Sequence, residues 1–358
     1  MKKATTLVFL MLLSSSGFLS ISGAATEDVL EKIESLPKAE RQKALEDGAR
    51  KEGSVTVYGV LNTDEHGPIN TGFQKKYPFL KVDFLRAAAA KNFERALMEK
   101  RAGKVRGDLF IGATLEMVAG KKEGTFASYR SPEAEVYPEA LRDPDGYWVS
   151  LAMLINVMAY NSDLVPEQDA PRGYMDLLHP KWKRKIGVDL EIEKTATALV
   201  QAWGWEKARD YFIRLAAQEP HFRKGHTLLV QLLCAGEFPV IFEAYGYRTA
   251  DMAKRGCPVR LVFGDPIPVG ALPVAMMAQA PHPHVAALYY DFLLSAPGVE
   301  FVRARGRTPS RPGLESIYPE LKGVKERKNL LVLNPNAFGR IYPQVSSLLD
   351  ETLFKGRR

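Results

Sequence analysis

Segments with strand-like and helix-like patterns alternate along most of this 358-residue chain. Short runs of β-branched and other apolar residues, such as the run from Val55 to Val60, predict buried strands. Between them lie stretches whose apolar residues recur every three or four positions, which predicts helices. In the first part of the chain we expect strands at residues 55–60, 80–85 and 108–112 and helices at residues 67–76 and 92–102. This alternation predicts βαβ units and therefore an α/β fold, with mainly parallel sheets and helices on both faces.

A second α/β set follows in the middle of the chain. We expect its strands at residues 186–189, 239–243 and 259–263 and its helices at 195–205, 206–217 and 227–235. Two long apolar runs, near residues 150–160 and 265–275, flank this set, and we interpret the first as a strand pair. The pattern predicts two lobes joined by two crossings. Lobe 1 would comprise residues 53–150 and 276–358, the inserted lobe 2 residues 151–275, and residues 26–52 an N-terminal helical segment interrupted at Pro37.

The first 25 residues have the pattern of a cleavable signal peptide. Lys2 and Lys3 precede a short apolar run, and small residues follow it up to Ala25. The apolar run is too short for a permanent membrane anchor, and later stretches do not reach the length of a membrane helix. We therefore predict a periplasmic protein. In that oxidising compartment Cys234 and Cys257 could form a disulfide or remain two buried thiols, and the sequence leaves both alternatives open.

Charge and motifs narrow the functional class. The net charge is +7, with basic residues scattered among acidic ones, so the basic stripe that nucleic-acid binding requires is not predicted. The sequence contains no nucleophile elbow, no phosphate-binding loop and no His-Glu-x-x-His zinc motif, and we expect no enzyme activity. It also contains no coiled-coil heptads, and we expect a monomer without a cofactor.

Several short strings, taken in order, carry a family resemblance. They are residues 49–53, 55–59, 73–78, 106–110, 159–161, 235–240, 280–283 and 292–295. Together they resemble the type II periplasmic solute-binding proteins of ABC transporters, and within them the ferric-ion-type branch. The likeness covers nearly the whole mature chain. It implies a two-lobed fold, a cleft between the lobes, and delivery of a captured ligand to an inner-membrane ABC permease.

The resemblance also implies that four loops line the cleft. The predicted ligand-binding residues on these loops are Asn62, Thr63, Thr114, Thr195, Thr197, Glu243, Tyr245 and Tyr247. We expect residues 61–66 to form a turn after the first strand, and a helix to start at Thr195, where free N–H groups favour an anion. Thr195 could instead cap that helix. If the segment after Glu243 is extended, Tyr245 and Tyr247 point to the same face.

Two ligand classes remain open within this family. Ferric-binding relatives use adjacent tyrosines, whereas here Gly246 separates Tyr245 from Tyr247. The first hypothesis is therefore a small, oxygen-rich anionic solute, for which the tyrosines would provide ring contact and hydroxyl groups. The alternative is ferric iron with a synergistic anion, held by Tyr245 and Tyr247 with His66 as a further ligand. A third hypothesis is a ligand sensor that signals to a membrane kinase.

Overall fold

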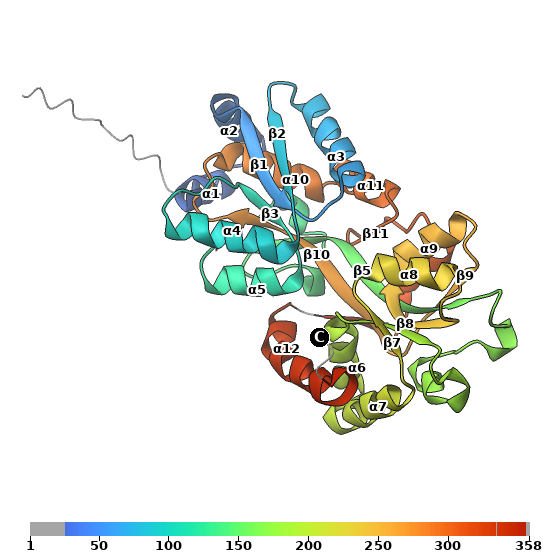
Figure 1. Cartoon of the computed structure of the whole chain (residues 1–358). Coiled ribbons are helices and arrows are strands. Elements are labelled where there is room, and N and C mark those ends of the chain that lie inside the picture. Colours follow the sequence, from blue (N-terminus) through green and yellow to red (C-terminus); the bar gives the residue numbers. More distant parts are fainter. Residues whose placement is uncertain (1–25, 334, 356–358) are drawn as a thin grey trace, which may run out of the picture.

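The computed structural model describes residues 26–333 and 335–355, so the predicted signal peptide lies outside the described residues. The strands form one connected mixed sheet, whose main path runs β2-β1-β3-β10-β5-β8-β6-β7. Figure 1 shows two groups of strands, each accompanied by helices, with β5 and β10 running between them. The predicted two-lobed α/β fold is confirmed.

The first lobe is built on three parallel strands, β2, β1 and β3, to which β10 adds an antiparallel neighbour. Two helices occupy the predicted N-terminal helical segment, and Pro37 separates them. The elements of this lobe are α1 (Thr26–Glu34), α2 (Lys38–Glu52), β1 (Ser54–Gly59), α3 (Thr63–Lys76), β2 (Lys81–Arg86), α4 (Ala89–Arg101), β3 (Leu109–Ile111), α5 (Thr114–Lys122), β4 (Phe126–Ala127), α10 (Pro283–Leu294), α11 (Ala296–Ala304) and β11 (Thr308–Pro309).

The core of the first lobe centres on α10. Most residues of this helix are buried, and they pack against α2 and β1 in one hydrophobic cluster. Among the described residues, no single helix is long and apolar enough to cross a membrane. In the described part of the chain, one helix pair, α10 with α11, reaches that length and apolar character together, but the two helices are bent by 64° relative to each other.

The second lobe contains another parallel group, in which β6 lies between β7 and β8. Its core is a cluster of aromatic and aliphatic side chains that includes Tyr174, Tyr211 and Phe242. The elements are β6 (Ile186–Asp189), α6 (Glu193–Trp203), α7 (Trp205–Ala217), β7 (His221–Arg223), α8 (His226–Cys234), β8 (Val240–Tyr245), α9 (Gly246–Lys254) and β9 (Val259–Val262).

Two long antiparallel strands, β5 (Trp148–Asn161) and β10 (Ile267–Met277), connect the lobes. The first half of β5 pairs with β10, and its second half pairs with β8 and β9. The predicted strand pair near residues 150–160 is therefore wrong. One strand of 14 buried residues runs through both lobes, and each half of it pairs with different neighbours.

The C-terminal helix α12 (Pro335–Leu349) follows β12 (Leu330–Val332) and continues as a π-helical turn over Asp350–Phe354. Val345, Leu349 and Phe354 belong to the hydrophobic core of the second lobe. The helix also meets α5 of the first lobe, where Gly339 lies against Val118. The lobe boundaries stay a prediction, and within residues 276–358 both α12 and the segment around Tyr318 and Leu321 pack against elements of the second lobe.

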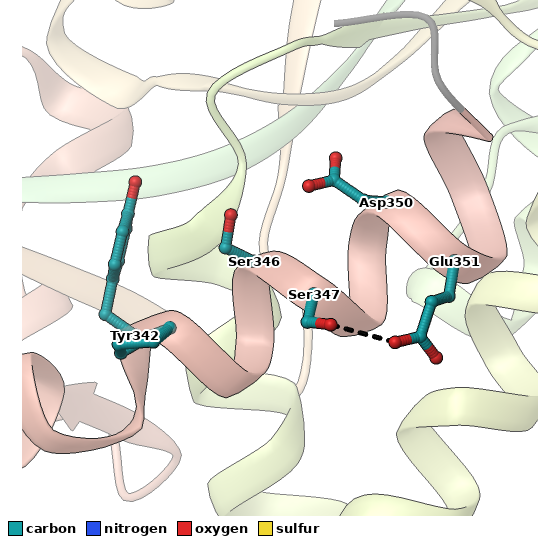
Figure 2. A pocket seen from close by; sticks show the side chains of 6 residues that line it. Tyr342, Ser346, Ser347, Asp350 and Glu351 are labelled. Carbon is teal, nitrogen blue, oxygen red and sulfur yellow. Dashed lines mark hydrogen bonds between the residues drawn. The ribbon is translucent and has the colours of Figure 1, made fainter.

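A pocket follows one side of this helix and its π-helical continuation. Figure 2 shows Tyr342, Ser346, Ser347, Asp350 and Glu351 along it, with the Ser347 hydroxyl donating to the Glu351 carboxylate at 2.8 Å. The pocket includes none of the predicted ligand-binding residues.

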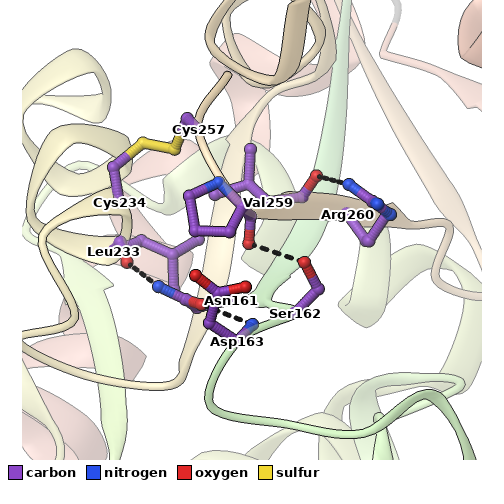
Figure 3. Close-up of a disulfide and its surroundings, with 9 residues drawn as sticks. Asn161, Ser162, Asp163, Leu233, Cys234, Cys257, Val259 and Arg260 are labelled. Atoms are coloured by element: carbon purple, nitrogen blue, oxygen red, sulfur yellow. Dashed lines mark hydrogen bonds between the residues drawn. A yellow bond between two sulfur atoms is a disulfide. The ribbon is translucent and has the colours of Figure 1, made fainter.

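A disulfide between Cys234 and Cys257 joins the end of α8 to the segment before β9, with the two Cα atoms 5.5 Å apart. Figure 3 shows that the side chain of Asn161, at the end of β5, lies nearby and donates to the carbonyl of Leu233 at 2.8 Å. Ser162 donates to the carbonyl of Pro258 at 3.2 Å. The alternative of two separate thiols is not what the structure shows.

Removing this disulfide is expected to lower the free energy of unfolding by about 3 kcal/mol. The bridge closes a loop with a sequence separation of 23, and loops of this length have that effect on the entropy of the unfolded chain. The measurement is urea denaturation of the variant Cys234→Ala/Cys257→Ala. Wild-type protein in excess reductant should lose the same amount, and equal stability of all three samples would contradict the prediction.

Candidate ligand-binding site

The candidate site is built around the carboxyl end of β8, where Tyr245 is the last strand residue and Gly246 begins α9. In open α/β sheets, ligands bind at the carboxyl ends of the strands. Tyr245 pairs with Asn156 of β5, so the site lies directly beside a strand that connects the lobes. Gly246 packs closely there, because an added Cβ would lie 3.0 Å from Cδ2 of Leu321.

A buried polar network lies beneath Tyr245. The imidazole of His226 lies between two carboxylates, with Nδ1 2.6 Å from Asp189 and Nε2 3.3 Å from Glu243. The amide of Asn156 donates to the Thr195 hydroxyl at 3.1 Å and to Glu243 at 3.4 Å. Asp189 ends β6 and His226 begins α8, so the carboxyl ends of neighbouring strands supply the network.

Burial and mutual attraction shift the pKa values of this network. Burial raises the pKa of Glu243 to about 7, although the charge of His226 opposes this. Burial alone would lower the pKa of His226, but Tyr245, Asp189 and Glu243 raise it to about 9. Burial would raise the pKa of Asp189, but the hydrogen bond with His226 holds the pKa of this carboxylate below its ordinary value. At neutral pH the site therefore contains an imidazolium paired with the Asp189 carboxylate.

Tyr245 is surrounded by positive charge. Its ring packs edge-on to the imidazole of His226, with centroids 4.4 Å apart, and the Lys194 ammonium lies 5.8 Å from the ring centre. Burial would raise the pKa of Tyr245, but the charges of Lys194 and His226 lower it below its ordinary value. The phenol therefore ionises more readily than a phenol in water.

Tyr247 lies in the first turn of α9, so the chain changes from strand to helix between Tyr245 and Tyr247 and the condition of an extended segment is not met. The two tyrosine rings nevertheless stack, with centroids 6.0 Å apart and an interplanar angle of 22°. The guanidinium groups of Arg248 and Arg307 lie 5.2 and 5.1 Å from the centre of the Tyr247 ring. Arg307 also forms a buried bidentate pair with Glu65 of α3, at 2.6 and 3.2 Å.

Within residues 26–333 and 335–355, several buried side-chain oxygens have no hydrogen-bond partner. Four of them, on α5, β5 and α6, belong to Thr114, Glu116, Asn156 and Thr197. Buried polar atoms are nearly always satisfied by protein, water or ligand, so oxygens of this kind indicate a place where a polar ligand or water belongs. Glu116 of the first lobe lies close enough to Lys194 of the second for their charges to interact, which places this region where the lobes meet.

The structure brings only some of the predicted residues together. Thr195 and Glu243 belong to one buried network, because both accept hydrogen bonds from Asn156. Glu243 also contacts His226, whose ring packs against Tyr245, and the Tyr245 ring stacks on Tyr247. Thr197 is fully buried on the same helix as Thr195. Asn62 precedes α3, its N–H donating to Glu65, while Thr63 is exposed in the first turn and Thr114 is buried at the start of α5.

Two local predictions require correction. Residues 63–66 are not a turn but the first turn of α3, because Glu65 reaches back to the N–H of Asn62 and stabilises a helix start there. Helix α6 begins at Glu193, not at Thr195, with Ile192 at the N-cap position. Thr195 therefore does not cap its helix, and its hydroxyl instead accepts from Asn156.

His66 lies on α3, where its ring stacks on Phe84 with centroids 4.0 Å apart. Burial lowers its pKa. Within residues 26–333 and 335–355, no group of three or more His, Cys, Asp or Glu side chains is arranged to hold a metal ion. A role for His66 as an iron ligand stays a prediction.

Sequence reasoning missed Asn156, Asp189, Lys194 and His226 as site residues. One signal could have found Asp189, since it is the last residue of the predicted strand 186–189 and carboxyl ends of strands bind ligands. His226 follows Gly225 at the start of a predicted helix and gave no such signal. Its position depends on contacts with residues 17 and 37 positions away, which a local pattern does not contain.

Comparison with known proteins identifies one protein family and several relatives. A family model described as bacterial extracellular solute-binding protein matches residues 108–338. Iron uptake protein A1 from Synechocystis sp. (strain ATCC 27184 / PCC 6803 / Kazusa) is 22% identical over 356 residues, covering 94% of this chain and 93% of that protein.

Solved structures share the fold. Iron-bound HitA from Pseudomonas aeruginosa superimposes with a TM-score of 0.73 at 20% identity, covering 84% of this chain and 99% of that one. AfuA from Actinobacillus pleuropneumoniae, solved with exogenous fructose-6-phosphate, gives 0.71 at 20% identity with the same coverage. The Trichodesmium protein IdiA (FutA), solved with iron and citrate, gives 0.71 at 18% identity, again with that coverage. At these identities the structural likeness establishes the fold alone.

Proposed function

The chain belongs to the family of bacterial extracellular solute-binding proteins, and on that premise we propose that it is the periplasmic receptor of an ABC uptake transporter that captures a small, oxygen-rich anion. It would bind the solute between its lobes, close over it and deliver it to an inner-membrane permease without chemical change. We expect it to act as a monomer, exported through the signal peptide at residues 1–25.

The observation that carries this proposal is the concentration of positive charge around Tyr245. The ammonium of Lys194 and the imidazolium of His226 flank its ring. Helix α6 begins beside them, and the free N–H groups of a helix start attract anions. The buried hydroxyls of Thr114, at the start of α5, and Thr197, on α6, have no hydrogen-bond partner among the described residues. Together these groups match the donors that a phosphate or carboxylate requires.

Ferric iron is a second candidate, which the lowered pKa of Tyr245 favours. A phenolate is a hard oxygen donor suited to ferric iron, and Tyr247 stacks beside it. Under this alternative, Lys194 would hold the accompanying anion. The relatives whose names mention iron uptake, or whose structures contain iron, support the same alternative.

Titration calorimetry with Tyr245 variants tests the position of the site. The probe is the ligand identified by native mass spectrometry of protein purified from its own periplasm. Tyr245→Phe should cost about one hydrogen bond, roughly 0.5–1.5 kcal/mol of binding free energy, and Tyr245→Ala should cost more because ring contact is also lost. Tyr77→Phe is the control, since it removes a hydroxyl bonded to Gln42 in the first lobe. Wild-type affinity in both Tyr245→Ala and Tyr247→Ala would show that the site lies elsewhere.

A further inference from the structure

We propose that Lys194 determines the charge of the solute, because its ammonium lies beside the ring of Tyr245, the tyrosine whose phenolate would have to bind a metal ion. The site would then accept an oxyanion and exclude a ferric ion. This inference rests on the proposed function and makes its substrate class more specific.

Lys194 is held at the junction of the two lobes. It is the second residue of α6 in the second lobe, and its ammonium lies 5.8 Å from the centre of the Tyr245 ring. The charges of Glu243, on β8, and Glu116, on α5 of the first lobe, also act on it. A single cation therefore interacts with groups from both lobes.

The stem of Lys194 has a defined place on strand β10. At Gly270 an added Cβ would lie 3.3 Å from Cδ and 3.7 Å from Cε of Lys194, so the lysine stem occupies the space that a side chain at position 270 would need. A stem packed against a connecting strand keeps the ammonium close to Tyr245. We infer that Lys194 is a fixed part of the site and not a mobile surface lysine.

The surroundings of the second tyrosine favour the same conclusion. Arg248 and Arg307 lie over the Tyr247 ring, so each tyrosine of the pair already has its own positive neighbours. Arg307 is paired with Glu65, so Arg248 and Lys194 are the cations that would repel a ferric ion placed between the rings. An oxyanion would instead be attracted by the same groups, with Lys194 as a direct donor.

The variant Lys194→Met tests this inference, because it removes the charge while keeping a long apolar stem. Calorimetry uses inorganic phosphate, citrate and fructose 6-phosphate as separate probes. Wild-type protein should bind at least one of them, and Lys194→Met should bind it about 10- to 100-fold more weakly, as expected for the loss of a hydrogen bond from a charged group. Lys194→Arg, which keeps the charge, should retain most of the affinity.

Iron binding is measured in parallel by absorption, after addition of ferric nitrilotriacetate. Wild-type protein should show no phenolate-to-iron band, Lys194→Met should gain one, and Lys194→Met/Tyr245→Phe should lose it again. A visible band in wild-type protein would overturn the inference, as would anion affinity in Lys194→Met within twofold of wild type. In the second case the proposed function would stand. If wild-type protein binds none of the three anions and no iron, the proposed function itself fails, and the inference fails with it. Circular dichroism and thermal melting confirm that each variant folds.

Discussion

Replacing Arg307 by methionine is expected to lower the free energy of unfolding by about 3–5 kcal/mol, because it leaves a carboxylate buried without its partner. The side chains of Arg307 and Glu65 are only 8% and 5% exposed. Two hydrogen bonds, at 2.6 and 3.2 Å, join them. Without the guanidinium, the N–H of Asn62 is the one donor that the described part of the chain still offers to the Glu65 carboxylate.

Urea denaturation of three variants tests this expectation. Arg303→Met is the matched control, since Arg303 also makes a bidentate pair with a glutamate, Glu300, but at the surface, where loss of the pair should cost less than about 1 kcal/mol. Glu65→Gln/Arg307→Met should recover part of the loss, because the remaining side chain carries no charge. If Arg307→Met is as stable as Arg303→Met, burial adds nothing to the contribution of the Arg307–Glu65 pair to stability.

The same pair shows what local patterns contain and what they omit. Alternation along the chain predicted the strands and helices, because the period of apolar residues depends only on neighbouring positions. Glu65 and Arg307 are 242 positions apart, and neither position has a pattern that indicates the other. Long-range polar contacts of this kind account for most of the site residues that the sequence did not reveal.

Strand β5 is a second example. Its run of 14 buried residues carries no alternation of apolar and polar side chains, since both faces are covered. Such a run gives no sign of whether one strand or two are present, because the distinction depends on its partners. The structure resolves it by pairing one end with β10 and the other with β8 and β9.

The rings of Tyr245 and Tyr247 lie beside one another, but not for the reason that the sequence suggested. An extended segment would have put Tyr245 and Tyr247 on one face by its twofold period. In the structure the chain changes from strand to helix at Gly246, and the rings stack across that junction. The two rings are therefore neighbours because strand β8 ends between them. The side chains of Lys194 and His226 lie beside Tyr245 at the same strand end.

The free energy of unfolding is expected to fall as the pH rises from about 5 to above 9. His226 has a pKa of about 9 in the folded protein, against an ordinary value of 6.5. Its stabilising effect is complete below pH 6.5 and is lost as the pH rises through 9. Glu243 has a folded pKa of about 7 against 4.5, so ionisation in the unfolded chain lowers stability between pH 4.5 and 7. Each of these two pKa shifts, taken separately, changes the free energy of unfolding by about 3 kcal/mol.

Neighbouring charges set the limits of this pH range. The pKa of Asp189 is lowered by its hydrogen bond with His226, so its stabilising effect is present above its ordinary value of 3.8 and is lost in stronger acid. Tyr245 and Lys194 are the other groups that face His226 and Glu243. Burial would raise the pKa of Tyr245 and lower that of Lys194, but their mutual attraction lowers the pKa of Tyr245 and raises that of Lys194. Stability should therefore be greatest near pH 5, where His226 is charged, Glu243 is neutral and Asp189 is ionised.

Urea denaturation at pH 5, 7 and 9 measures this profile. His226→Gln should remove the decline between pH 7 and 9, and Glu243→Gln should remove the decline between pH 5 and 7, because each variant eliminates one titrating group. His179→Gln is the control, since His179 is exposed at the surface and should leave the profile unchanged. A wild-type profile that is flat from pH 5 to 9 would show that the folded protein does not hold the protons of His226 and Glu243 more tightly than the unfolded chain. The buried network would then lack the charge arrangement on which recognition of an anion beside Tyr245 depends.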